Sequence, residues 1–364
     1  MAEWKRVRLG DVACIKTGKL NSCAATIDGR YPFFTCAEFP LKIDTYAYDS
    51  ESVLVAGNCT PYVNYYKGKF NAYQRTYIIT PSVTYVSAKW LYYLMKRNIR
   101  HMIHRQQGTV EKYFVLSDFT DEDLLLPPLA TQRKIAAVLG AIDDKIETNR
   151  KICANLEAQA QAIFKNSDRQ NDTIPFTALI KILSGGTPKT SEPSYWCGDI
   201  PFFSPKDVGE PYAIYTERTI TKDGLDSCNS GFYLKDTTFV TARGTVGKVC
   251  LAGVPMAMNQ SCFALASDSI DPLLVYYYTK ASIDSLKSKA NGSVFDAITI
   301  AEFETERIAR LKESEEREFV NIVRPMFDKI LSLSFESRAL AAMRDALLPK
   351  LMSGEIDVSK VEVA

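Results

Sequence analysis

The chain has few of the residues that build common catalytic and metal sites. It contains only two histidines, and its nine cysteines are scattered without a CxxC pair, so neither a zinc site nor a disulfide framework is predicted. Scattered thiols suit a reducing compartment. No apolar run approaches 18 residues, and the N-terminal segment MAEWKRVRLGDV has no apolar signal core. We therefore expect a cytoplasmic protein with no membrane partner.

Motifs typical of enzymes are also missing. The sequence has no GxxxxGK[ST] phosphate loop, no GxGxxG dinucleotide fingerprint and no GxSxG nucleophile elbow. The Asn/Asp-Pro-Pro-aromatic motif of adenine methyltransferases is absent, and SGGTPKT, from Ser184 to Thr190, lacks the phosphate-loop spacing. His101 and His104 have no acidic or thiol neighbours, which favours a surface position. We predict no catalytic residue, no metal ligand and no directly bound cofactor.

Charge is distributed unevenly along the chain. Residues 1–120 hold 16 Lys/Arg against 9 Asp/Glu, whereas residues 171–300 hold 11 against 13, and the net charge of the whole chain is +1. A basic first third fits contact with phosphates, although a solvated surface with a chance excess of charge would give the same count.

The chain repeats itself at a shift of 184 residues, without a gap between about residues 91 and 164. Upstream the match needs other offsets: YPFFT at Tyr31 resembles IPFFS at Ile200, and Gln74 pairs weakly with Gln260. A unit of this length predicts two tandem domains and a pseudo-twofold axis rather than a solenoid. The gapless block aligns LYYLMKRNI with VYYYTKASI, Gly108-Thr109-Val110 with Gly292-Ser293-Val294, and Asp144-Lys145-Ile146 with Asp328-Lys329-Ile330.

Each repeat ends in a heptad pattern. After Pro127-Pro128, apolar residues recur every seven positions with a companion row four residues on, which predicts a coiled-coil seam. Ser353-Gly354 supplies the stop of the second helix, and Pro325 should kink or restart it. The predicted seam contains Ile135, Leu139, Ile142, Ile146, Asn149, Leu156 and Ile163, and in the second repeat Phe319, Met326, Ile330, Leu333, Leu340 and Leu347.

The two helices can bury their seams against each other, or each can pack on its own domain. Polar residues cover the rest of the first helix, which favours the pair. Ile135 and Ile163 are 28 residues apart, which is roughly 42 Å of helix. One turn of B-DNA is roughly 34–36 Å, so such a rod could hold two DNA-binding domains about one turn apart.

What remains is binding chemistry. Basic side chains contact phosphates, and Asn, Gln, Arg and Lys in loops can read base edges. Asn71, Gln74 and Arg75 are the loop candidates in the first repeat; Arg243, Asn259 and Gln260 are those of the second. If Gln74 and Gln260 correspond, they should not distinguish two targets, which favours a scaffold role for both. The whole candidate DNA-binding set is Lys16, Lys19, Asn71, Gln74, Arg75, Ser184, Gly185, Gly186, Thr187, Lys189, Lys206, Arg243, Lys248, Asn259 and Gln260.

Several segments resemble the specificity subunit of type I restriction-modification systems. They are LPPLATQRKIAAVLGAIDDKIETNRK, SGGTPKTSEPSYWCGDIPFFSPKDV, RGTVGKV, MAMNQSCFAL, NGSVFDAIT and LLPKLMSGEIDVS, and the likeness covers nearly the whole chain. The resemblance implies two α/β (α+β) target-recognition domains in tandem, separated by two long helices that form an antiparallel coiled coil with pseudo-twofold internal symmetry. The implied boundaries are 1–125 and 167–310 for the recognition domains, 126–166 and 311–351 for the helices, and 352–364 for the tail.

The resemblance also implies a non-catalytic reader of a bipartite, asymmetric site in double-stranded DNA. Its helices would bind two methyltransferase subunits, and restriction subunits would join separately. S-adenosylmethionine, ATP and Mg would then be bound by partner subunits. The remaining alternatives are an enzyme with its own nuclease or methyltransferase, a protein-interaction scaffold, and a recognition subunit of a related methyltransferase-only system.

The second repeat departs from the family pattern. The helix start LPPL..Q, from Leu126 to Gln132, is replaced by ARLKESEEREF, which lacks proline and is strongly charged. The second repeat is also acidic overall. We therefore expect its basic residues Lys189, Lys206, Arg243 and Lys248 to gather on one face.

Overall fold

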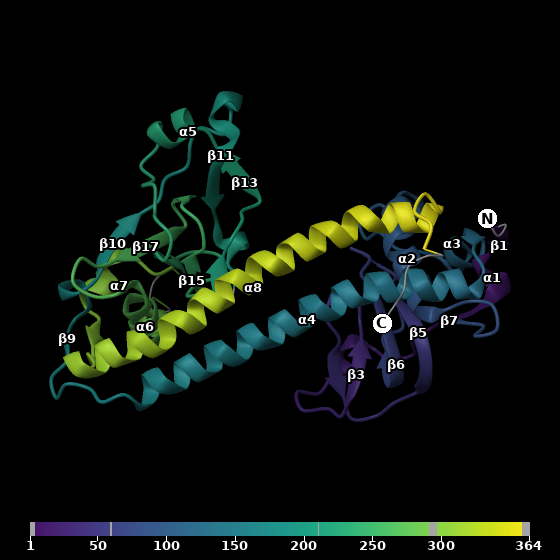
Figure 1. Ribbon diagram of the computed structural model, residues 1–364, viewed down its shortest axis with the longest axis horizontal. Coiled ribbons are helices and arrows are strands. Elements are labelled where there is room, and N and C mark those ends of the chain that lie inside the picture. Colours follow the sequence, from purple (N-terminus) through teal and green to yellow (C-terminus); the bar gives the residue numbers. More distant parts are fainter. Residues whose placement is uncertain (1–3, 59, 210, 291–296, 359–364) are drawn as a thin grey trace. The chain divides into compact units, whose positions relative to one another are not determined.

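The computed structural model describes residues 4–58, 60–209, 211–290 and 297–358. It comprises unit 1, residues 1–145 with 340–364, and unit 2, residues 146–339. Each unit holds an α/β domain and one segment of each of two long helices, α4 (Leu129–Asn166) and α8 (Glu313–Ser353) (Figure 1). The predicted architecture of two α/β domains with two long helices is confirmed. The predicted repeat at residues 292–294 lies outside the described residues.

Unit 1 is built on a six-stranded mixed sheet in the order β2-β7-β5-β6-β3-β4. Helix α2 packs on this sheet through an apolar face that includes Trp90, Tyr93 and Met95, and Ser87 caps its start. The elements are β1 (Lys5–Arg8), α1 (Leu9–Val12), β2 (Ala13–Thr17), η1 (Ser22–Ala24), β3 (Tyr31–Phe34), β4 (Leu41–Ile43), β5 (Tyr48–Ala56), β6 (Val63–Ala72), β7 (Thr76–Pro81), α2 (Ala88–Met102), η2 (Ile103–Arg105), α3 (Leu116–Thr120) and β8 (Asp123–Leu126).

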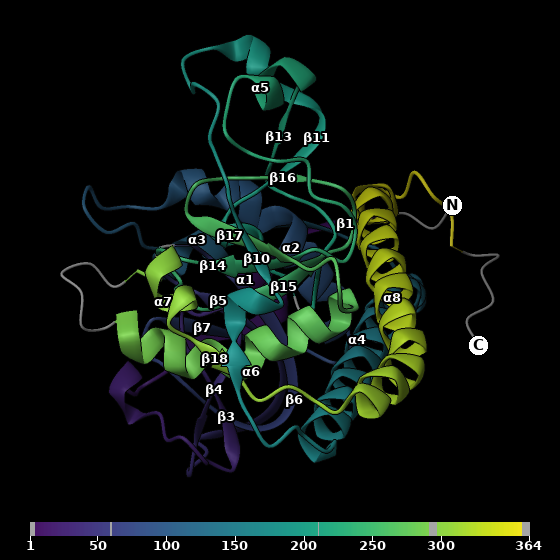
Figure 2. The same cartoon turned by 90° about the vertical axis from the view of Figure 1, so that its left-hand side faces the viewer.

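Unit 2 has a five-stranded sheet, β10-β17-β14-β15-β12, and a three-stranded sheet, β13-β11-β16. Helix α6 lies against the larger sheet (Figure 2). The elements are β9 (Ile174–Pro175), η3 (Phe176–Ala178), β10 (Lys181–Ser184), η4 (Pro193–Tyr195), β11 (Trp196–Phe203), η5 (Pro205–Asp207), β12 (Tyr212–Ala213), β13 (Arg218–Ile220), α5 (Lys222–Asp226), β14 (Thr238–Thr241), β15 (Val249–Ala252), β16 (Ala257–Met258), β17 (Cys262–Ala266), α6 (Pro272–Ala290), α7 (Ile300–Glu304) and β18 (Arg307–Ile308).

The two domains share one strand plan with one difference. The antiparallel order β2-β7-β5 in unit 1 recurs as β10-β17-β14 in unit 2. Strand β6 corresponds to β15 and β16 together, because β3 pairs in parallel with the end of β6 as β11 does with β16. Pro255 lies in the break between β15 and β16. Proline has no amide to donate to a ladder, which accounts for one continuous strand becoming two.

Within each unit the segments of α4 and α8 pack along their predicted seams. In unit 2, Asn149 donates to Glu336 at 2.9 Å, and the Cys153 thiol lies 3.8 Å from the carbonyl of Ile330, so the two segments run antiparallel. In unit 1, Arg344 donates to Asp143 at 2.7 Å. The seam residues buried below a tenth of their surface are Ile135, Leu139, Asn149, Phe319, Ile330 and Leu333, while Ile142, Ile146, Leu156, Ile163, Met326, Leu340 and Leu347 are half-buried.

The expectation that Pro325 restarts the second helix is wrong, because α8 runs without interruption from Glu313 to Ser353. A kink at Pro325 stays a prediction. Pro325 is exposed, and so is Asn321 four residues earlier, whose carbonyl loses its usual donor. That carbonyl lies on the solvent side, where water can replace the missing amide. The helix ends before Gly354, whose φ of +78° is the left-handed conformation that glycine adopts easily.

Candidate nucleic-acid interface

In unit 1 the candidate base-reading residues lie on the turn between β6 and β7. Gln74 and Arg75 are exposed there. The Gln74 amide donates to the Leu20 carbonyl at 2.8 Å, and the Thr76 amide donates to the Tyr73 carbonyl at 2.8 Å. The backbone of this turn is therefore fixed while two polar side chains project from it.

Asn71 does not belong to this exposed group. It lies inside strand β6, not in a loop as predicted, and is only 3% exposed. Its Oδ1 accepts from the Ala72 amide at 3.0 Å. An amide that is buried and engaged with its own backbone cannot reach a base edge, so Asn71 is a scaffold residue. Lys16, on β2, and Lys19, just after it, are exposed and suited to phosphate contact.

The turn before β17 in unit 2 occupies the same place in its domain. The amide of Asn259 donates to the carbonyl of Phe203 at 2.9 Å, as Tyr73 donates to Phe34 at 2.9 Å in unit 1. Gln260 is therefore the counterpart of Gln74, and the weak sequence pairing at a shift of 186 residues is confirmed.

Further backbone bonds repeat around the two turns. The Gly57 amide donates to Arg75 at 2.8 Å, and the Ala242 amide donates to Ser261 at 2.8 Å. The next bond also recurs, from Phe114 to Gly57 at 2.7 Å and from Ile298 to Ala242 at 3.1 Å. In each domain, the same set of backbone hydrogen bonds thus holds the same short turn. We call this set of bonds the frame.

A glycine lies against each turn. A Cβ on Gly18 would stand 2.2 Å from the Ala72 carbonyl oxygen, and one on Gly185 would stand 2.1 Å from that of Asn259. Only glycine allows the strand end to pass this close to the turn. Packing therefore explains why position 185 of SGGTPKT is glycine, while contact of Ser184 and Gly185 with DNA stays a prediction.

The rest of the glycine-rich loop contacts the second turn directly. The Thr187 hydroxyl donates to the Gln260 side-chain carbonyl. A Cβ on Gly186 would stand 2.6 Å from the Asn229 amide. Asn229 is exposed beside this loop, and sequence reasoning missed it because nothing in the repeat or the motifs marks it. Lys189 is exposed further along the same loop.

Basic residues of unit 2 differ in how far they are already engaged. Lys206 is exposed but lies 3.9 Å from Glu217, and Arg243 and Lys248 are exposed on the β14–β15 loop. The gathering of Lys189, Lys206, Arg243 and Lys248 on one face stays a prediction.

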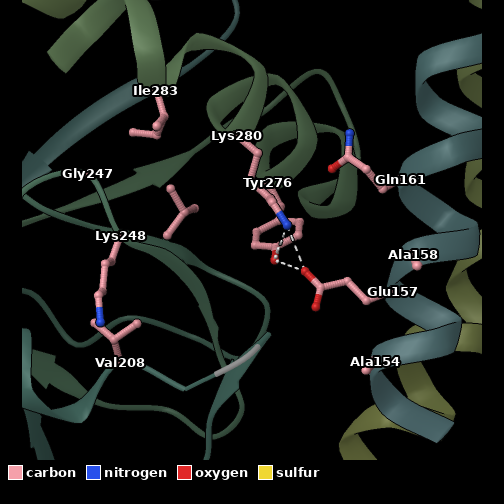
Figure 3. Close-up of a pocket in the computed structure, with 11 residues that line it drawn as sticks. Ala154, Glu157, Ala158, Gln161, Val208, Gly247, Lys248, Tyr276, Lys280 and Ile283 are labelled. Atoms are coloured by element: carbon pink, nitrogen blue, oxygen red, sulfur yellow. Dashed lines mark hydrogen bonds and ion pairs between the residues drawn. The ribbon is translucent and has the colours of Figure 1, made fainter. Parts of the chain in front are cut away.

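Another lysine of unit 2, Lys280, lines a hollow of about 520 Å³ (Figure 3). Here Glu157 of α4 accepts from the Lys280 ammonium at 2.7 Å and from the Tyr276 hydroxyl at 3.0 Å, both on α6. Burial, together with the Glu157 charge, raises the pKa of Tyr276 well above its ordinary value. Because its charge is neutralised internally, Lys280 serves to hold α6 on α4 rather than to bind phosphate.

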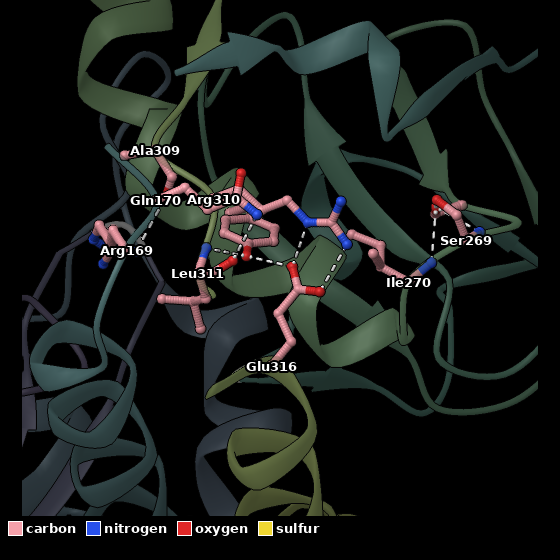
Figure 4. Close-up of polar contacts among 10 residues, drawn as sticks. Arg169, Gln170, Ser269, Ile270, Ala309, Arg310, Leu311 and Glu316 are labelled. Carbon is pink, nitrogen blue, oxygen red and sulfur yellow. Dashed lines mark hydrogen bonds and ion pairs between the residues drawn. The ribbon is translucent and has the colours of Figure 1, made fainter. Parts of the chain in front are cut away.

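The charged start of α8 also has a structural explanation (Figure 4). Arg310 forms two 2.8 Å bonds to Glu316, which also accepts from the Tyr278 hydroxyl at 2.8 Å. In unit 1 the same position is Gln132, which accepts from the Ser87 amide at 2.9 Å and donates to the Pro127 carbonyl at 2.8 Å. An ion pair in the second repeat replaces the neutral glutamine of LPPL..Q.

Two further searches cover the described part of the chain. Over those residues, no group of three or more His, Cys, Asp and Glu side chains is placed to hold a metal ion. Nor does any helix there have the length and apolar character needed to cross a membrane.

Comparison with known proteins places these features in a family. The model for the type I restriction modification DNA specificity domain matches residues 1–158 and again residues 170–328. The chain is 40% identical over 148 residues to the EcoDI specificity subunit of a type I restriction enzyme from Escherichia coli, a match that covers 41% of this chain and 33% of that protein. The matched segment thus spans about a third of that relative's length.

Two other relatives match over more of their length. The HindI specificity subunit of a type I restriction enzyme from Haemophilus influenzae is 22% identical over 77% of this chain and 80% of its own. The crystal structure of a type I restriction-modification S subunit from M. genitalium covers 96% of both chains with a TM-score of 0.61 at 17% identity. This last likeness concerns the fold.

Proposed function

Because the chain belongs to the type I restriction modification DNA specificity family, we propose that it is the non-catalytic, DNA-reading subunit of such a system. Each domain reads one half of a bipartite, asymmetric site in double-stranded DNA. The observation that carries this proposal is the duplicated turn, in which the same backbone frame presents Gln74-Arg75 in unit 1 and Gln260-Ser261 in unit 2. The two equivalent frames carry the same Gln but differ at the next residue, which is the exposed Arg75 in unit 1 and the half-buried Ser261 in unit 2. This difference suits two half-sites of different sequence.

The two long helices are the proposed docking surface for two methyltransferase subunits. Large apolar side chains remain exposed on them away from the seam: Ile152 is 38% exposed, Ile322 41% and Phe335 39%. All three lie in unit 2, where they would add apolar contacts to one docking site, and the docking of two methyltransferase subunits itself rests on the family. In the complete cytoplasmic complex, S-adenosylmethionine would be held by the methyltransferase subunits, and ATP and Mg by a restriction subunit.

A binding experiment tests the proposal against the scaffold alternative. The chain is co-expressed with a methyltransferase subunit from the same genome, and the purified complex is titrated against labelled genomic fragments at about 50 to 300 mM salt. We expect co-purification and a DNA affinity that falls linearly with salt on a logarithmic plot, because lysines and arginines displace counterions from phosphates. Co-purification with no DNA binding, or with binding that salt does not change, would favour a protein-interaction scaffold.

A further inference from the structure

We propose that Arg75 reads a guanine in the half-site bound by unit 1, donating two hydrogen bonds from its guanidinium to O6 and N7 of that base. The inference rests on the proposed function and extends it by naming a residue that determines specificity. It concerns the turn of Gln74 and Arg75, whose backbone is held by hydrogen bonds to Leu20 and Gly57 of neighbouring segments.

The comparison of the two turns singles out the second position. Gln74 and Gln260 are the same residue in the same place, so neither can make the two half-sites differ. The next residue is Arg75 in unit 1 and Ser261 in unit 2, although both accept an equivalent backbone bond at 2.8 Å. The backbone hydrogen bonds are thus the same in both units, while the side chain at position 75 or 261 differs. This is expected for a residue that determines which DNA sequence is bound.

Arg75 is available because its internal partner holds it loosely. Its guanidinium lies 3.8 Å from Glu111, and the two side chains are 46% and 51% exposed. An exposed pair at this distance contributes little and is screened by salt. The Glu111 carboxylate is itself fixed, since it accepts from Asn58 Nδ2 at 2.7 Å. Glu111 therefore lies beside the guanidinium without neutralising it as a buried partner would.

The surroundings of Arg75 leave room for a base edge. Arg75 and Gln74 line a hollow of about 380 Å³ with Tyr77, Tyr113 and Phe114. The Tyr77 hydroxyl is already used, because it donates to the Phe114 carbonyl at 2.8 Å. The exposed polar side chains that line this hollow are then those of Thr17, Tyr113 and the turn itself, and of the residues lining it only Arg75 carries a charge. A guanidinium in this position matches the two acceptors of guanine in the major groove better than any other base.

In unit 2 the arginine of the frame, Arg243, lies on a different segment from the turn residue Ser261. Arg243 is the counterpart of Asn58, and its amide donates to the Ser261 carbonyl at 3.2 Å. Arg75 therefore belongs to the turn of unit 1 itself, whereas Arg243 lies next to the turn of unit 2, on the segment that holds Asn58 in unit 1. Substituting Arg243 gives a control that alters unit 2 and leaves the unit 1 turn intact.

The test is single-molecule mapping of N6-methyladenine in hosts that express the methyltransferase with the wild-type chain, Arg75→Ser, Arg75→Lys or Arg243→Ser. In both Arg75 variants we expect one guanine of one half-site to become degenerate, with discrimination reduced roughly 5- to 150-fold at that position. Lysine keeps the charge and three N–H donors but lacks the planar fork of arginine, so it should discriminate guanine less sharply than arginine does. Arg243→Ser should leave that half-site unchanged.

The opposite results are equally specific. An unchanged motif with uniformly weaker methylation in Arg75→Ser, restored by Arg75→Lys, would show a phosphate contact and overturn the assignment. Loss of both half-sites in a variant that still co-purifies with the methyltransferase would make Arg75 a structural residue and overturn it too. Should the wild-type chain direct no methylation at a split site, the proposed function itself would fail, which is a distinct outcome.

Discussion

The Tyr93 hydroxyl donates a 2.6 Å hydrogen bond to Asp143, whereas the hydroxyl of Tyr277, its counterpart at a shift of 184 residues, is buried with no partner among the described residues. The reason is a substitution on the facing helix: Phe327 takes the place of Asp143, and its ring centroid lies 5.9 Å from that of Tyr277. One structural position therefore holds a polar contact in unit 1 and an apolar one in unit 2.

This difference predicts opposite effects of one chemical change. Tyr93→Phe removes a donor from a carboxylate and should lower the free energy of unfolding by roughly 1.5–3 kcal/mol. Tyr277→Phe removes an unsatisfied buried hydroxyl and should leave it unchanged or raise it slightly. Urea unfolding of both full-length variants provides the measurement, and equal losses in the two would contradict the account.

The starts of the two long helices give a second matched pair. Gln132 is fully buried and bonds to backbone groups of Ser87, Tyr85 and Pro127. Gln132→Leu should leave those groups unpaired and cost roughly 1–3 kcal/mol for each that water cannot reach. Gln132→Glu, which copies the residue at position 316, should also destabilise, because unit 1 has Leu126 where unit 2 has Arg310. Thermal melting of both variants tests this, and a Gln132→Glu variant as stable as wild type would refute it.

Cysteine reactivity should follow burial. Burial raises the pKa of the Cys250 thiol to about 12, whereas Cys14, Cys23 and Cys197 are exposed. Maleimide at pH 8 should label the exposed three in the native protein and spare Cys250, as peptide mass spectrometry would show. The folded state holds the Cys250 proton more tightly than the unfolded chain does, so this thiol's contribution to stability is lost as pH rises above about 8.5. Labelling of Cys250 as fast as Cys14 would count against this packing.

The helices should also set the length of the unread spacer. Four residues inserted after Asn149 add about 6 Å of helix, so the spacer should lengthen by one or two base pairs, at about 3.4 Å each, with both half-sites unchanged. A four-residue insertion at the exposed Val83 serves as the control and should leave the spacer as it was. Methylation mapping reads both, and an altered half-site from the helix insertion would argue against the helices as a ruler.

Local and periodic signals were enough to predict much of the fold. The heptads led to the seam, Pro127-Pro128 marked the start of α4, and the self-alignment anticipated the duplicated elements. Contacts far apart in the sequence were not predictable in the same way. Asn71 resembled a loop residue because it lies between the polar stretches Lys67-Gly68-Lys69 and Gln74-Arg75. Glu111 gave no signal because its role depends on Asn58, 53 residues away.

The start of α8 illustrates the same limit. The charged run from Lys312 to Arg317 seemed to weaken the repeat, yet Glu316 closes a bidentate pair with Arg310 where the other copy has Gln132. An ion pair and a neutral glutamine thus occupy equivalent positions in the two repeats. A sequence alignment shows that the residues differ but not that both stabilise the start of the helix.

The most direct test of the central claim is a map of N6-methyladenine in a host that carries this chain and its methyltransferase, compared with the same host lacking only the chain. The account predicts a new motif made of two short, different, defined halves separated by unread base pairs, about one helical turn apart. A continuous or palindromic motif, or methylation that does not depend on the chain although the two proteins co-purify, would contradict it.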